Sequence, residues 1–309
     1  WGQEPKASGT ETPKAEGAAG ESPQSKTTSR TLPEALNFAN GLLQARRYDV
    51  AAEEYEKFLE TAEPGLDAAD ARYGLAVAYQ GLGKYQEARK QFELFLAMAP
   101  THPNVPIARF RVGESSYMLN DLAGARKTLE TFVKLYPEHR YAELAWPYLG
   151  DVRFSQRDFA GARESYQSAL EKYPQGRLTD RAQYGLGRSL AMLNQPDPAL
   201  EQFRALIKRG GEWTERAYYQ IGQLESARGR LEECLQALER LEALSPRSNL
   251  IPEARWIRAE ALLKLKRHGE AQAILKPLAD DPSTNLAGRA AYTLGLSYLE
   301  SDSPEQALE

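Results

Sequence analysis

An alanine recurs at a nearly fixed interval through this chain and marks a repeating unit. Eight positions share this interval: Ala51, Ala88, Ala125, Ala162, Ala199, Cys234, Ala271 and Ala307. The first five lie 37 residues apart, and the later steps are 35, 37 and 36 residues. A fixed period in the thirties is typical of stacked supersecondary units, none of which can bury its apolar face alone. The chain is therefore predicted to be a tandem array and not a globule built around one pocket.

Each unit is predicted to hold two helices. In the second unit, apolar or small residues fall at 71, 75, 78, 79 and 82, which are the three- and four-residue steps of one helix face. Gly83 then ends this helix, and a second amphipathic helix runs from Tyr85 to Ala99 before Pro100. Two helices joined by a short glycine turn form an antiparallel hairpin.

Small and large residues alternate in the same way in the other units. We number each repeat so that the recurring alanine is position 20, and position 1 is then Leu32, Ala69, Pro106, Glu143, Asp180, Glu215, Pro252 or Gly288. Position 8 is small, and position 24 is a large apolar residue: Tyr55, Phe92, Leu129, Tyr166, Phe203, Leu238 and Leu275. Glycine in a helix costs roughly 1 kcal/mol against alanine, so position 8 is expected to be kept small by a closely approaching helix backbone.

Over residues 32–309 the pattern of the units resembles the tetratricopeptide repeat. The shared features are small residues at positions 8 and 20, aromatic residues near position 11 and at position 24, and proline near position 32. The resemblance implies an all-α fold, a right-handed α-solenoid of helical hairpins. The expected solenoid contains about eight repeats of mostly 37 residues, and the last repeat is cut short in its second helix. The usual unit has 34 residues, and the extra residues here lie between units, after Tyr136-Pro137 and Tyr173-Pro174.

That longer link is similar to a bacterial envelope branch of the family. The branch includes the periplasmic Tol–Pal-associated cell-division coordinator and the lipoprotein of the outer-membrane β-barrel assembly machine. The resemblance implies a periplasmic or otherwise extracytoplasmic location after removal of a signal, with a cytoplasmic location as the alternative. A single cysteine fits either compartment.

Residues 1–31 differ in composition from the array. After Trp1 they contain no large apolar residue, and their acidic and basic side chains cancel. Such a segment cannot bury enough apolar surface to offset chain entropy, so we expect a disordered linker. Trp1 is not a methionine, and Glu309 falls in mid-repeat, which suggests a processed or cropped piece of a longer protein.

Catalytic and metal-binding patterns are not expected in this chain. His102, His139 and His268 lie far apart in the sequence, and Cys234 occupies the small position 20, where a buried thiol is inert. The glycines near Lys84 and Arg188 lack the strand and the spacing of a phosphate loop. We therefore expect no enzyme activity, no cofactor and no metal.

The first helices carry a candidate binding stripe at positions 5, 9 and 12, which in this family line the inner groove. Position 5 is aromatic in six of the eight units. The predicted partner-binding residues are Tyr73, Phe110, Tyr184, Arg188, Tyr219, Trp256, Glu260 and Tyr292. Two interpretations stay open and can hold for the same ring: a ladder for an extended peptide or partner helix, or packing against the next hairpin.

The predicted function is a protein–protein interaction scaffold that binds a protein or peptide in the concave groove, in a bacterial envelope complex. The strongest stretch is expected at Tyr184, Tyr219 and Trp256, where nearby arginines favour a partner with apolar anchors and acidic residues. The alternatives are a structural spacer, a self-associating module or the regulatory arm of a larger protein. The net charge of −4 does not favour binding to nucleic acid. The sequence contains no apolar run of about 18 residues, so membrane insertion is not predicted.

Overall fold

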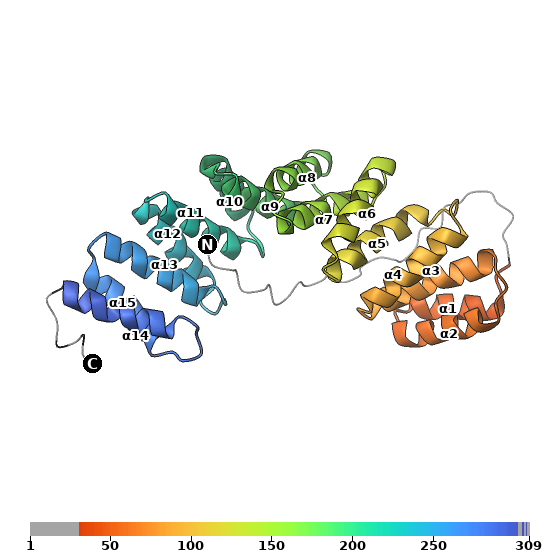
Figure 1. The fold of residues 1–309 in the computed structure, drawn as a ribbon, viewed down its shortest axis with the longest axis horizontal. Helices are drawn as coiled ribbons and strands as arrows, with labels where there is room; N and C mark the ends of the chain where they lie inside the picture. The colour runs from red at the N-terminus through yellow and green to blue at the C-terminus, as the bar shows by residue number, and fades with distance from the viewer. Residues whose placement is uncertain (1–30, 302–304, 306, 308–309) are drawn as a thin grey trace. The chain divides into compact units, whose positions relative to one another are not determined.

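The computed structural model describes residues 31–301, 305 and 307, and every regular element in them is an α-helix. The expected linker at 1–31 lies, apart from Thr31, outside the described residues. Figure 1 labels the helices: α1 (Glu34–Gln44), α2 (Tyr48–Thr61), α3 (Leu66–Gly81), α4 (Tyr85–Met98), α5 (Val105–Met118), α6 (Leu122–Leu135), α7 (Ala142–Ser155), α8 (Phe159–Lys172), α9 (Thr179–Met192), α10 (Pro196–Arg209), α11 (Thr214–Ala227), α12 (Leu231–Leu244), α13 (Ile251–Lys264), α14 (His268–Ala279) and α15 (Ala287–Glu300).

These helices form tandem hairpins, which confirms the predicted all-α solenoid of repeats. Odd-numbered helices are the first helix of a repeat and even-numbered helices the second, and each helix from α2 to α6 and from α9 to α15 packs on the one before it. The described residues of the eighth repeat give only its first helix, α15. The chain divides into two compact units between Val152 and Arg153, inside α7.

The turn inside each hairpin has one residue in the left-handed region. These residues are Arg46, Gly83, Asn120, Arg157, Asn194, Gly229 and Lys266, with φ between 58° and 73°. The next amide donates to a carbonyl five residues back, as from Lys84 to Tyr79 at 2.9 Å. This is the Schellman ending of a helix. Only two of the seven are glycines, so the glycine signal seen in the second repeat was not general.

The glycines at position 8 of the third, fifth and sixth repeats face a side chain, which corrects the close approach of two backbones expected there. A β-carbon at Gly187 would lie 2.7 Å from Cε1 of the Phe203 ring, and one at Gly113 would lie 2.8 Å from Cδ2 of Leu129. Both partners stand at position 24 of the same repeat. The missing β-carbon therefore makes room for the large residue of the second helix.

A second glycine contact joins consecutive repeats. A β-carbon at Gly74 would lie 2.7 Å from Cε1 of Tyr55, and one at Gly185 would lie 2.6 Å from Cε1 of Tyr166. Each glycine is at position 6, and each tyrosine is at position 24 of the preceding repeat. Where position 24 is phenylalanine or leucine, position 6 of the next repeat is larger: Arg111, Tyr148, Gln220, Ile257 or Thr293. Tyrosine at 24 is thus matched by glycine at 6.

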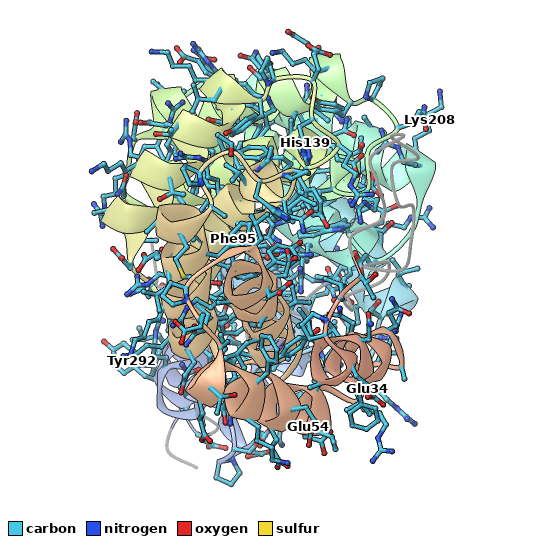
Figure 2. All side chains as sticks on the ribbon, turned by 90° about the vertical axis from the view of Figure 1, so that its right-hand side faces the viewer. Glu34, Glu54, Phe95, His139, Lys208 and Tyr292 are labelled. Atoms are coloured by element: carbon cyan, nitrogen blue, oxygen red, sulfur yellow. The ribbon has the colours of Figure 1, made fainter. Side chains whose placement is uncertain are left out.

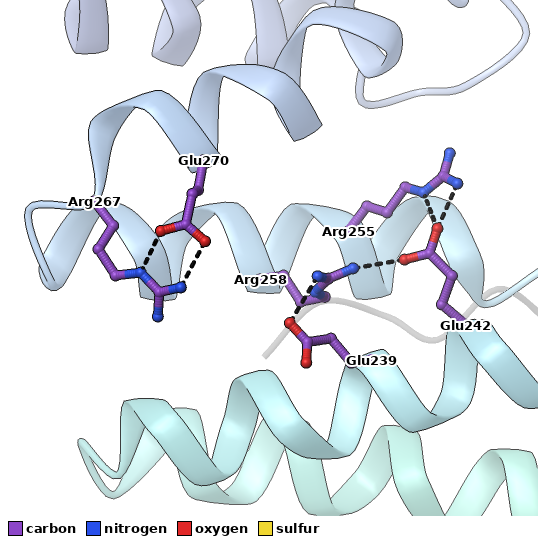
Figure 3. A network of polar contacts seen from close by, with 6 residues as sticks. All are labelled: Glu239, Glu242, Arg255, Arg258, Arg267 and Glu270. Carbon is purple, nitrogen blue, oxygen red and sulfur yellow. Dashed lines mark hydrogen bonds and ion pairs between the residues drawn. The ribbon is translucent and has the colours of Figure 1, made fainter.

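Position 7 forms the apolar contact between repeats, with one exception. Leu75 and Val112 are buried against the preceding repeat, in clusters around Tyr55 and Phe92. Position 7 of the seventh repeat is instead Arg258. Its guanidinium bonds Glu242 at 2.6 Å and Glu239 at 3.0 Å, both on α12. Arg255 also donates to Glu242, from Nε at 2.8 Å, so the contact between α12 and α13 is ionic (Figure 3).

The links before α5 and α7 each use a histidine as a hydrogen-bond acceptor. His102 Nδ1 accepts from the Asn104 amide at 3.1 Å, and His139 Nδ1 accepts from the Tyr141 amide at 3.2 Å. Ser248 does the same before α13, where its hydroxyl accepts from the Leu250 amide at 3.3 Å. A protonated imidazole cannot accept these bonds, because both ring nitrogens then carry hydrogen.

We expect the chain to lose stability below neutral pH through His139. Burial, and then the charge of Arg140, lower the pKa of His139 below its usual value. Between that lowered pKa and about 6.5 the unfolded chain binds more protons, so the free energy of unfolding falls as pH falls. Urea denaturation between pH 7.5 and 5 should show a smaller loss for His139→Ser, which keeps an acceptor that does not titrate. An equal loss in both proteins would contradict this role.

Candidate functional site

Of the two predicted rings of the first unit, Phe110 lies in the core and Tyr73 packs against it. Phe110 has no exposed surface and contacts Phe132, Tyr141 and Tyr148, with ring centroids 5.8, 5.0 and 6.1 Å away. Tyr73 is half-buried against Phe92 and Phe95, and burial raises its pKa to about 12. For Phe110 the packing interpretation of position 5 holds, because a partner cannot reach a ring without exposed surface. Phe95 is labelled in Figure 2.

Near Phe110 the first unit buries a polar cluster. Glu114, 8% exposed, accepts from Arg111 at 2.7 Å and from the Tyr148 hydroxyl at 3.3 Å, and Gln80 also donates to it. The Arg111 guanidinium lies 5.3 Å from the Tyr141 ring centroid. Three donors on one buried carboxylate stabilise its charge without an outside ligand. This cluster therefore ties successive first helices together and is not an open site.

In the second unit, position 5 belongs to a continuous row. The position-5 side chain contacts a residue of the next repeat or of the link before it. The contact is either a ring stacking on that residue or a hydroxyl bonding to it. The contacted residue lies in the link or at position 2 of the next repeat. Tyr184 contacts Trp213 at 5.0 Å between centroids, and Arg216 lies over Trp213 at 4.9 Å. One turn along α11, the Tyr219 hydroxyl donates to Glu253 at 2.6 Å.

The row continues on α13 and α15. One turn after Glu253 comes Trp256, and the guanidinium of Arg289 lies 4.6 Å from its ring centroid. Tyr292 follows one turn after Arg289, is 71% exposed and projects from α15 (Figure 2). We call these residues the aromatic–charge row: Tyr184, Trp213, Arg216, Tyr219, Glu253, Trp256, Arg289 and Tyr292.

Exposure within the row is uneven. Tyr184, Tyr219 and Trp256 are 9%, 4% and 8% exposed, whereas Arg216 and Arg289 are exposed and Trp213 is half-buried. The nearly buried rings therefore support their neighbours, and the surface open to another molecule is made by the arginines, Trp213 and Tyr292. Both interpretations of position 5 apply within this unit.

The structure places the two predicted residues at position 9 beside the row. Arg188 is half-buried, and its guanidinium lies 4.4 Å from the Phe154 ring centroid and 5.8 Å from that of Tyr184. Glu260 is half-buried on α13, one turn from Trp256. Arg188 thus extends the stacking at the Tyr184 end.

The sequence prediction missed Trp213, Glu253 and Arg289 as site residues. They fall at position 2 of the following repeat or in the link before it, outside the stripe at positions 5, 9 and 12. A signal was present in the sequence, since position 2 is charged in five of the eight repeats: Asp70, Arg181, Arg216, Glu253 and Arg289. Its meaning depended on knowing that position 5 of one repeat touches position 2 of the next.

The repeat pattern and the hairpins identify the family. A model of the tetratricopeptide repeat matches residues 36–103, 78–140, 113–177, 148–213, 184–249 and 216–283. These overlapping matches span well over half of the chain, which therefore belongs to the tetratricopeptide repeat family. Proteins of this kind are interaction scaffolds.

Solved structures show the same fold. The C-terminal part of a tetratricopeptide repeat-containing protein from Cytophaga hutchinsonii is 15% identical, with a TM-score of 0.66 over 82% of this chain and 98% of that one. A tetratricopeptide repeat protein from Parabacteroides merdae is also 15% identical, with a TM-score of 0.60 over 78% and 90% of the two chains. At this identity the similarity concerns the fold alone. No curated protein matches the sequence.

Among the described residues, every helix is too short or too polar to cross a lipid bilayer.

Proposed function

We propose that this chain binds a peptide or helix of a partner protein along the aromatic–charge row and serves as a scaffold in a bacterial envelope complex. The observation that carries the proposal is the open part of the row, in which two exposed arginines lie over tryptophan rings beside the exposed Tyr292. Tryptophan, tyrosine and arginine dominate interface energies, and each often contributes about 2 kcal/mol or more. The envelope location rests on the Tyr-Pro links between repeats.

The test is differential capture by the immobilised full chain from an extract of the source cell. We expect the double variant Trp213→Ala and Tyr292→Ala to bind its partner at least tenfold more weakly than the unmodified chain. Both side chains are partly exposed, so helicity measured by circular dichroism should be unchanged. The matched control is Met192→Ala with Leu244→Ala, two large apolar side chains that are 40% and 54% exposed outside the row.

Equal loss in both double variants would place the partner elsewhere on the chain and contradict the proposed site. Capture of the chain itself, with a concentration-dependent mass in light scattering, would favour the self-association alternative. Immunoblotting of periplasmic and cytoplasmic fractions of the source cell tests the location, and signal in the cytoplasm alone would contradict it.

A further inference from the structure

The charges of the row have an order that restricts the partner. We infer that the partner segment carries two acidic side chains, one for Arg216 and one for Arg289, separated by a neutral or basic residue that faces Glu253. This inference rests on the proposed binding at the aromatic–charge row and specifies the chemistry of what binds there.

The two arginines are prepared to bind carboxylates. Each guanidinium lies over a tryptophan ring, at 4.9 Å for Arg216 and 4.6 Å for Arg289. Stacking restrains the guanidinium plane and leaves its N–H edges for bidentate bonds, so less side-chain entropy is lost when a carboxylate binds. Within the described part of the chain neither guanidinium has a carboxylate partner, although 43 acidic residues are present in the sequence.

Glu253 separates the two positive charges. It occupies position 2 of the seventh repeat, between Arg216 in the sixth and Arg289 in the eighth. The Tyr219 hydroxyl, which also accepts from Gln223 at 3.0 Å, donates to this carboxylate and holds it in the row. A third acidic side chain at the middle of the partner would lie against a like charge, which is unfavourable. The row therefore selects a pattern of charges and not simply a negative segment.

The repeat geometry sets the spacing. Neighbouring packed helices lie about 8–10 Å apart, so position 2 of the sixth and eighth repeats, two repeats apart, are separated by roughly 20 Å. The first helices α11 and α13 pack directly on each other. An extended chain advances about 3.3 Å per residue, so the two acidic side chains should be about six residues apart.

Nucleic acid fits this row less well. A single strand has a phosphate at every nucleotide, and one of them would lie against Glu253 while the chain as a whole has a net charge of −4. A peptide can have an uncharged residue there, and the exposed Tyr292 offers an apolar contact beside Arg289.

The experiment selects random 13-residue peptides displayed on phage against the full chain. We expect enriched peptides to contain two acidic residues about six apart. A synthetic copy of an enriched peptide, followed by fluorescence anisotropy, should bind at least tenfold more weakly to Arg216→Gln with Arg289→Gln, and more weakly in 300 mM than in 50 mM salt. The control Arg240→Gln with Arg247→Gln removes the same charge from exposed sites outside the row and should leave the affinity unchanged.

The possible failures are distinct. Enriched peptides that need Trp213 and Tyr292 but lack the acidic pair, or that bind the arginine variant equally well, would overturn the inference and leave the proposed site standing. Failure to enrich any peptide, or enrichment that ignores both sets of variants, would overturn the site and the inference together. Arginine-dependent binding of a 12-nucleotide single strand, tighter than that of the peptides, would show that the row prefers a nucleic acid.

Discussion

Gly185→Ile is expected to lower the free energy of unfolding by about 3 kcal/mol, the upper end of the usual cost of overpacking. Even a β-carbon at this site would lie 2.6 Å from Cε1 of Tyr166, whose ring is 2% exposed and has no room to move away. Tyr166→Leu alone leaves a cavity and is also destabilising, by about 2 kcal/mol. Together, the two changes reproduce the pair Leu238 and Ile257, which already stand at these positions between the sixth and seventh repeats.

The double variant should therefore be more stable than the sum of the single changes predicts, by about 1–3 kcal/mol, the size of coupling seen for residues in contact. Thermal and urea denaturation of the four proteins gives this coupling energy. Gly288→Ile is the control, because no atom lies within 4 Å of the site of its β-carbon. If the losses of unfolding free energy caused by Gly185→Ile and Tyr166→Leu simply add in the double variant, the tyrosine and the glycine are not matched to each other.

Arg258→Ala should be the second most damaging change, lowering the free energy of unfolding by roughly 2 kcal/mol. Its side chain is 16% exposed and holds Glu239 and Glu242, so its removal leaves Glu239 without this partner and Glu242 with Arg255 alone. Arg258→Leu should cost much less, because leucine or another aliphatic residue fills position 7 in most other repeats and a well-packed apolar residue can replace an ion pair.

The dependence of stability on salt concentration distinguishes an ionic contact at position 258 from an apolar one. The stability of the unmodified chain should fall between 50 and 500 mM sodium chloride by more than that of Arg258→Leu, because screening weakens the ionic contact and not the apolar one. Arg267→Ala, which breaks the exposed pair with Glu270 within one helix turn, is the control and should change little (Figure 3). Equal salt dependence of Arg258→Leu and the unmodified chain would contradict an ionic contact at this joint.

The sequence predicted the helical hairpins well, because their signals are local. The three- and four-residue steps placed the helices, and α4 ends at Met98, just before the predicted end at Ala99. The turn residues were less predictable, since Arg46, Arg157 and Lys266 adopt the left-handed region although nothing in their side chains favours it. The continuity of the chain into a second helix imposes that conformation.

The candidate site was harder to predict because its exposure depends on contacts between repeats. Phe110 and Tyr73 occupy the same position, yet the first is fully buried against the link residue Tyr141 and the second is half-buried, with Asn104 at the equivalent link position. The residue in the link decides the outcome, and links vary from repeat to repeat. A periodic pattern identifies which positions are equivalent, but it does not show what covers each of them.

The matching of tyrosine with glycine limits how the repeats can be rearranged. Removal of the second repeat alone would bring Arg111 against Tyr55, and removal of the fifth would bring Gln220 against Tyr166. Removal of the second, third and fourth repeats together would instead join Tyr55 to Gly185, a pair already found at both natural joints with tyrosine. In this array the repeats are therefore not interchangeable modules, and a deletion avoids this mismatch only where each tyrosine at position 24 is still followed by a repeat with glycine at position 6.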